Sequence, residues 1–202
     1  MDEARAVREY WFGGEPLDAQ AIERRQDLWF GAGSGQHDEE IRARFGALLE
    51  RAAAGQLAGW ADGPRRRLSL ILLLDQFPRH MFRGTARAFE YDEQALTLAL
   101  TGMQSGADGA LDFAERMFFY MPLEHAESLD AQEESVAAFR RLLAEVPPEL
   151  HAAFAEPLRF AEEHRSIIER FGRFPHRNAL LGRTSTREES EWLEEDGKSF
   201  GQ

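Results

Sequence analysis

Glycine and proline clusters interrupt this chain about every twenty residues, a spacing that suits helices of ordinary length. The interruptions include Gly13-Gly14, Gly31–Gly35, Gly55–Gly59, Gly106–Gly109 and Pro147-Pro148. The stretches between them are rich in Ala, Leu, Glu, Arg and Gln, which favour helices, and they contain no alternating β-branched segments. The pattern therefore predicts an all-α fold of stacked antiparallel helix pairs, as in helical-repeat proteins.

The same signals predict where the helices lie. Apolar spacing and flanking breakers place helices over residues 2–11, 18–30, 91–101, 112–120, 130–145 and 149–171, with others beginning near 38 and after 186. One further helix begins near Asp62, carries Leu68–Leu74 and is expected to end before Pro78. Pro122 is expected to interrupt the chain after residue 120, and Thr186 and Glu189 have the spacing of a capping box.

Length and hydropathy together predict one domain. The 202 residues, of which 43% are hydrophobic, suffice for a folded core, so we expect a single all-helical domain over residues 1–202. The acidic run Glu188–Asp196 is expected to be a solvated helix face within a flexible tail of residues 187–202.

The charge of the chain excludes some classes of partner. A formal net charge of -12 and a pI near 5.0 disfavour nucleic acid and anionic membrane surfaces, because both need a net basic face. No apolar run approaches the roughly 20 residues of a membrane span, and the N-terminus is too charged for a signal peptide. The absence of cysteine excludes thiolate chemistry and fits a cytoplasmic protein.

The sequence contains no motif for a cofactor, and we predict none. The glycines of Gly31–Gly35 lack the Lys-Ser/Thr pair of a phosphate-binding loop, and no strand precedes them. A Gly-x-Ser-x-Gly motif is absent, so a serine hydrolase has no support. We predict no metal site either, because no His-Glu-x-x-His pattern is present.

The most informative segment is Leu68–Phe89, where a leucine run leads into a cluster of polar residues. It places Asp75, Gln76, Arg79 and Arg83 around the predicted end of a helix. A carboxylate is unfavourable there because the C-terminal end of the helix dipole is negative. Such a conflict marks either a ligand site, in which Asp75 orients arginines that bind an anion, or a structural ion pair.

A second cluster follows an apolar run that ends in Pro122. His125 is flanked by Glu124 and Glu127, so His125 is a candidate general acid or base with a carboxylate to orient it. The alternative is that His125 caps the preceding helix and forms only local hydrogen bonds.

A third cluster, Gly172–Thr186, repeats the Phe-Pro-then-basic pattern of the first. It contains Arg173, His176, Arg177 and Asn178, and His164 lies two turns before it. The functional interpretation is a second wall of an anion-binding or acid–base site. The alternative is a solvated basic turn that caps the long helix, where cations suit the dipole.

These segments resemble a known family. The motifs LLLDQFPRHMFRGTARAF, FFYMPLEHAES and HRSIIERFGRFPHRNALLGRTST, with WFGG and DEEIRARFG before them, are similar to those of the bacterial family catalogued as domain of unknown function 924. The resemblance covers nearly the whole chain and implies an all-helical, tetratricopeptide-repeat-like superhelix. It implies no established activity.

Three functional hypotheses follow. The first is a small-molecule site, with an anionic ligand as partner, in which catalysis falls to His125, His176 and Glu127 and binding to Asp75, Gln76, Arg79, Arg83, His164, Arg173, Arg177 and Asn178. The second is a module that binds a protein or peptide along a concave surface lined by exposed tryptophans. The third is a purely structural network. The sequence decides neither the reaction class nor the oligomeric state.

Overall fold

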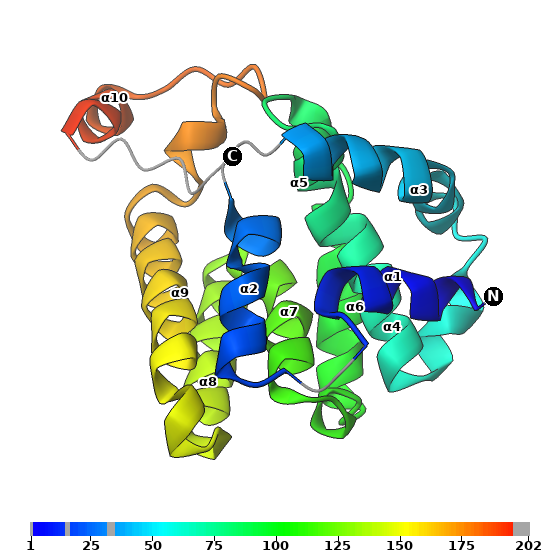
Figure 1. Ribbon diagram of the computed structural model, residues 1–202. Coiled ribbons are helices and arrows are strands. Elements are labelled where there is room, and N and C mark those ends of the chain that lie inside the picture. Colours follow the sequence, from blue (N-terminus) through cyan, green and yellow to red (C-terminus); the bar gives the residue numbers. More distant parts are fainter. Residues whose placement is uncertain (1, 15–16, 32–34, 196–202) are drawn as a thin grey trace.

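The computed structural model describes residues 2–14, 17–31 and 35–195, and this part of the chain is all-α without any strand (Figure 1). The predicted fold class is therefore confirmed. The α-helices are α1 (Glu3–Phe12), α2 (Ala19–Phe30), α3 (Gly35–Ala53), α4 (Pro64–Ile71), α5 (Phe77–Met81), α6 (Asp92–Gln104), α7 (Phe113–Glu124), α8 (Leu129–Glu145), α9 (His151–Phe171) and α10 (Arg187–Glu195).

The central helices form a row in chain order. Helix α4 packs on α6, α6 on α7, α7 on α8, and α8 on α9 (Figure 1). Short connections join α7 to α8 and α8 to α9, so these neighbours pair as antiparallel hairpins. Helix α1 packs on α4, and α3 packs on α5. The tetratricopeptide-like superhelix stays a prediction.

One helix crosses the predicted break at Pro78. The five residues Leu72–Gln76 between α4 and α5 form a π-helical turn, in which the N–H of Phe77 donates to the carbonyl of Leu72. Proline has no N–H and its ring clashes with the carbonyl four residues back, and a widened turn relieves both problems. The prediction that the helix ends before Pro78 is therefore wrong. Asp75 lies inside a helix, and the dipole argument does not apply to it.

Pro122 does not interrupt the chain either. It lies within α7, which continues to Glu124, and the N–H of His125 still donates to the carbonyl of Met121 at 3.0 Å. The predicted break after residue 120 is wrong because one missing donor near the last turn is tolerated when the helix is packed on both sides. As a result, Glu124 and His125 lie at the buried end of α7.

The C-terminal segment docks on the end of α9. Thr186 and Glu189 exchange backbone-to-side-chain hydrogen bonds of 3.1 and 2.7 Å, which confirms the capping box. Trp192 packs with Ile167, Ile168 and Phe174 in a hydrophobic cluster separate from the main core. Residues 187–195, placed by the sequence in a flexible tail, thus form a docked helix, and residues 196–202 lie outside the described part.

Close packing between α6 and α7 yields a stability prediction. A Cβ atom added at Gly102 would lie 2.4 Å from Cζ of Phe119 and 2.7 Å from Cδ of Arg67. We expect Gly102→Ala to destabilise the protein by about 2 kcal/mol through overpacking, despite the better helix propensity of alanine. Gly46→Ala, within α3 and facing open space, is the control and should stabilise by about 0.5–1 kcal/mol. Equal melting temperatures of the two variants would contradict the packing argument.

Candidate functional site

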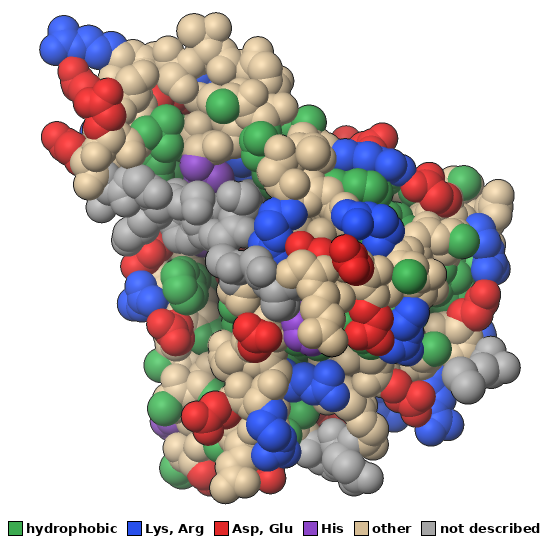
Figure 2. Space-filling model, turned by 45° about the horizontal axis from the view of Figure 1, so that its top comes forward, with side chains coloured by type: hydrophobic (Ala, Val, Ile, Leu, Met, Phe, Trp, Pro, Cys, Tyr) green, Lys and Arg blue, Asp and Glu red, His purple; other side chains and the backbone are tan. Residues whose placement is uncertain are grey.

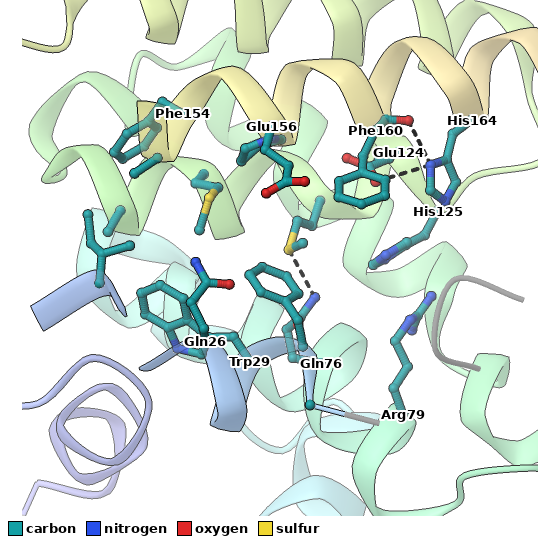
Figure 3. Close-up of a pocket in the computed structure, with 18 of the residues that line it drawn as sticks. Gln26, Trp29, Gln76, Arg79, Glu124, His125, Phe154, Glu156, Phe160 and His164 are labelled. Atoms are coloured by element: carbon teal, nitrogen blue, oxygen red, sulfur yellow. Dashed lines mark hydrogen bonds and ion pairs between the residues drawn. The ribbon is translucent and has the colours of Figure 1, made fainter. Parts of the chain in front are cut away.

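A pocket of about 550 Å³ lies between α2, α7, α9 and the helix that carries the π turn. Its polar residues include Gln76, Arg79, Glu124, His125 and His164, and its apolar residues include Ile22, Trp29, Phe30, Met117, Phe154 and Phe160. Figure 3 shows Arg79, Glu124, His125 and His164 gathered at one end, with Trp29 and Phe154 toward the other. The pocket therefore has a polar end, and its other part combines apolar side chains with Gln26 and Glu156.

The polar end is built around a buried Asp–His pair. Nδ1 of His125 lies 2.7 Å from Oδ1 of Asp75, and Nε2 of Gln76 donates to Oδ2 of Asp75 at 2.6 Å. Asp75 lies within the π turn and is fully buried. Burial opposes ionisation, but the positive charge of Arg79 and the hydrogen bonds from His125 and Gln76 hold the pKa of Asp75 below its usual range. Asp75 is thus a carboxylate.

The same environment keeps His125 uncharged. Burial, followed by the charge of Arg79, lowers the pKa of His125. A neutral imidazole beside a carboxylate donates its Nδ1–H to that carboxylate, which leaves the lone pair on Nε2. His125 lines the pocket, so it can accept a proton from a bound molecule.

The pKa of Glu124, the residue before His125, is shifted in the opposite direction. Burial, strengthened by the negative charge of Asp75, raises the pKa of Glu124 to about 8. Glu124 therefore carries its proton at neutral pH. Two carboxyl groups whose surroundings push their pKa values apart are a common arrangement of acid and base in active sites.

His164, on α9, forms the far wall of this polar end. Its Nδ1 donates to the carbonyl of Phe160 at 2.8 Å and lies 3.3 Å from Oε1 of Glu124 (Figure 3). Burial lowers the pKa of His164 to about 3, so the ring is neutral at physiological pH. Its contact with Glu124 is consequently polar rather than an ion pair.

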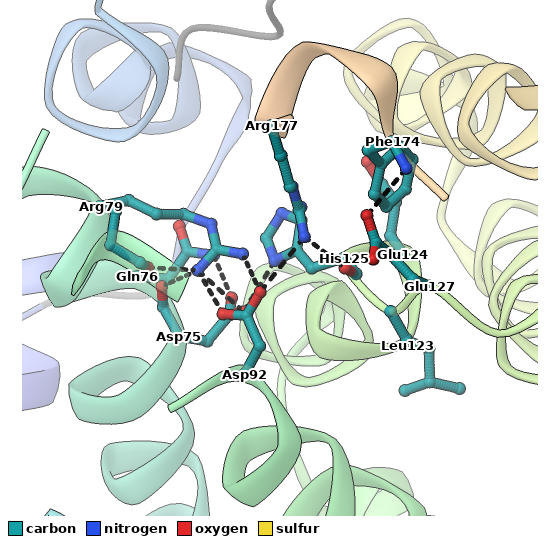
Figure 4. Close-up of polar contacts among 12 residues, drawn as sticks. Asp75, Gln76, Arg79, Asp92, Leu123, Glu124, His125, Glu127, Phe174 and Arg177 are labelled. Atoms are coloured by element: carbon teal, nitrogen blue, oxygen red, sulfur yellow. Dashed lines mark hydrogen bonds and ion pairs between the residues drawn. The ribbon is translucent and has the colours of Figure 1, made fainter. Parts of the chain in front are cut away.

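Two arginines share one carboxylate behind the pocket (Figure 4). Arg79 donates to Oδ1 and Oδ2 of Asp92 at 2.9 and 3.0 Å, and to the carbonyl of Asp75 at 2.6 Å. Arg177 lies 3.5 Å from Oδ2 of Asp92 and donates to the carbonyl of His125 at 3.0 Å. Asp92 therefore links the two Phe-Pro segments, which lie side by side.

The rest of the second Phe-Pro segment does not line the pocket. Glu127 accepts from the N–H of Phe174 at 2.8 Å and from Arg183 at 2.6 and 2.9 Å. Arg173 pairs with Glu189, which also accepts from Asn178 at 3.3 Å. These contacts fasten the segment to the α7–α8 connection and to α10.

The structure divides the predicted site residues into two groups. The pocket is lined by Gln76, Arg79, Arg83, His125 and His164, with Asp75 directly behind His125, whereas Glu127, Arg173, His176, Arg177 and Asn178 do not line it. Arg83 is paired with Asp38 at 3.1 Å, and His176 packs against the ring of Phe174.

Sequence reasoning missed two residues as members of the site. The sequence presents Glu124 as a neighbour of His125, and the apolar run before it is the signal that this carboxylate is buried. Asp92 stands at the start of α6, where an acidic residue looks like ordinary first-turn chemistry. Only the fold shows that Asp92 reaches both Arg79 and Arg177.

Other classes of site find little support in the described residues. None of their helices is long and apolar enough to cross a membrane, and no three of their His, Asp or Glu side chains are placed to hold a metal ion. Figure 2 shows acidic and basic side chains interspersed on one face. That face lacks the continuous basic surface that binding to a phosphate backbone requires.

Comparisons relate the chain to other bacterial proteins. The family described as "Bacterial protein of unknown function (DUF924)" matches residues 7–197. A solved structure of a protein of unknown function from Agrobacterium tumefaciens has 37% sequence identity and a TM-score of 0.80, over 95% of this chain and 97% of that one. No curated protein matches. The matched range includes every residue of the pocket.

Proposed function

This chain belongs to the bacterial family DUF924, and we propose that it binds a small molecule in the pocket and transfers protons to and from it. The observation that carries the proposal is the convergence of Asp75–His125 and Glu124 on one pocket, with His125 unprotonated and Glu124 protonated at neutral pH. A base and an acid ready in opposite states are what general acid–base chemistry needs.

Each group has a definite role in this proposal. Nε2 of His125 removes a proton from the bound molecule or from a water, and Asp75 stabilises the imidazolium that forms. Glu124 delivers its proton to a second atom of the bound molecule. Transfer of the proton from His125 back to Glu124, directly or through water, then restores the starting state.

The pocket lining favours this chemistry over a covalent mechanism. Among the described lining residues there is no Ser, Thr, Lys or Tyr, and the chain has no Cys. The described part of the lining thus offers none of the usual hydroxyl, thiol or amine nucleophiles. Water or a group of the substrate itself would be the nucleophile.

The test is a search for turnover with a matched histidine control. We expect His125→Gln to reduce the rate for any substrate found in a panel of esters, amides and hydroxy acids by roughly 100-fold or more, because the base is lost. His151 does not line the pocket, and its Nε2 lies 3.1 Å from the carbonyl of Val146, so His151→Gln should keep the wild-type rate. Equal rates of wild type and His125→Gln would contradict the proposal.

The competing hypotheses have weaker support. A peptide groove would use exposed tryptophans, but Trp11, Trp29 and Trp60 are buried. A structural role accounts well for Arg173 and Glu127, which are paired away from the pocket. It does not account for a buried, protonated Glu124 that faces open volume, since removing water from a carboxyl group costs stability.

A further inference from the structure

Among the residues that the structure describes, the charges around the polar end of the pocket balance. Two cations, Arg79 and Arg177, lie with two carboxylates, Asp75 and Asp92, in one connected network. At the edge of the pocket, Arg83 pairs with Asp38. Glu156, which also lines the pocket, pairs with Arg159 at 3.0 Å. The other described ionisable side chains of the lining add no charge at neutral pH, because His80, His125 and His164 are unprotonated and Glu124 is protonated.

A charged ligand would therefore lose its hydration without gaining an uncompensated partner. Burial of an unpaired ion is costly, whereas a neutral polar group loses little if it forms hydrogen bonds. The arginines that the sequence suggested as anion ligands already bind carboxylates, and Arg79 does so through two nitrogen atoms. Charge balance thus argues against an anion.

The polar end also offers a replaceable hydrogen bond. Nε2 of Gln76 gives one N–H to Asp75 and lies 3.3 Å from the thioether sulfur of Met121, a weak acceptor. An oxygen of a ligand would be a stronger acceptor for that donor. The proton of Glu124 is a second donor in the same region.

Part of the apolar wall of the pocket is exposed to solvent. Phe30 and Phe160 are 46% and 36% exposed, and both line the pocket. Trp29, Met117 and Phe154, which are largely buried, complete the apolar part of the lining. Apolar area of this kind is stabilised when a ligand covers it.

We propose that the ligand is an uncharged amphipathic molecule, with an apolar body against Phe30, Phe154 and Phe160 and a neutral, oxygen-bearing head at Gln76 and Glu124. This inference rests on the proposed function, since it assigns the ligand class of the same site. It predicts that esters, amides and neutral alcohols bind in preference to carboxylates, phosphates and amines.

Three probes with one apolar body test the charge preference: 4-phenylbutanamide, 4-phenylbutanoate and 4-phenylbutylguanidinium. Their dissociation constants are measured by titration at pH 6.5, where Glu124 is protonated. We expect the amide to bind at least about tenfold more tightly than either ion. Phe160→Ala should weaken the binding of the amide severalfold. Leu181 is an equally exposed apolar residue outside the pocket, so Leu181→Ala should leave the binding of the amide unchanged.

Several results would overturn the inference: binding of either ion as tight as the amide, no measurable binding of the amide, or amide binding unaffected by Phe160→Ala. Nitrogen-15 NMR of the His125 ring measures the protonation of Nε2. It therefore distinguishes a wrong ligand class from a wrong catalytic role. A protonated Nε2 at neutral pH would refute the catalytic role, even if the amide preference held. An unprotonated Nε2 with anion preference would refute only the ligand class.

Discussion

Asp75→Asn is expected to lower the melting temperature by roughly 10 °C, from a loss of about 3–5 kcal/mol, because it removes one charge from a buried network. The carboxylate of Asp75 is inaccessible to solvent and contacts His125, Gln76 and Arg79. The carboxamide keeps the shape but leaves Arg79 and Arg177 with one carboxylate fewer.

Thermal unfolding of Asp75→Asn beside Glu162→Gln checks this expectation. Glu162 forms an ion pair with Arg140 between α9 and α8, but both side chains are largely exposed, at 46% and 63%. Exposed pairs contribute about 0–1 kcal/mol, so the control should shift the melting temperature by only a few degrees. A comparable shift in the two variants would mean that Asp75 is not part of a desolvated network.

Glu124→Gln is expected to be more stable than wild type at pH 9, by about 4 kcal/mol, and nearly equal to it at pH 4.5. The folded protein raises the pKa of Glu124 from its ordinary 4.5 to about 8, because burial and the charge of Asp75 disfavour the carboxylate. The stability of the wild type is therefore highest below pH 4.5 with respect to this group and is lost as pH rises to about 8. A glutamine cannot ionise and avoids that loss.

Denaturant unfolding of both proteins at several pH values measures the effect. The groups that face Glu124 are Asp75 from the π turn, Arg79 from α5, His125 beside it and His164 from α9. These groups are present in both proteins, so the difference between the two pH profiles isolates Glu124. If the free energies of unfolding of the two proteins changed in parallel with pH, the pKa of Glu124 would not be raised in the folded protein. Glu124 could then not be the proposed acid.

This second prediction also distinguishes function from structure. A carboxylate that serves only a structural ion pair stabilises the fold, and its replacement by glutamine is destabilising at neutral pH. A buried acid that is kept protonated for chemistry lowers the stability of the fold as pH rises, because its surroundings disfavour the ionised carboxylate. The sign of the change at pH 8 or above decides between them.

Local chemistry was sufficient to predict the fold class. Helix-forming stretches between glycine and proline clusters led to an all-α chain, and Thr186 with Glu189 led to the capping box, because these signals act within a few residues. The errors at Pro78 and Pro122 arose where packing overrode a local rule. A π turn and a well-packed last helical turn accommodate each proline.

The site was predictable only in part. Asp75, Gln76, Arg79, Arg83, His125 and His164 carry chemistry that the sequence displays, and they do gather at one pocket. The roles of Glu124 and Asp92 depend on long-range neighbours: α9 buries Glu124 beside His164, and Asp92 joins arginines from positions 79 and 177.

Helix content and candidate polar residues are therefore properties of the sequence, since propensity, capping and apolar spacing act over a few residues. Protonation states and charge balance belong to the tertiary structure. They depend on how far each group is removed from water and on which charges the fold brings within a few ångströms, and neither quantity is contained in local spacing.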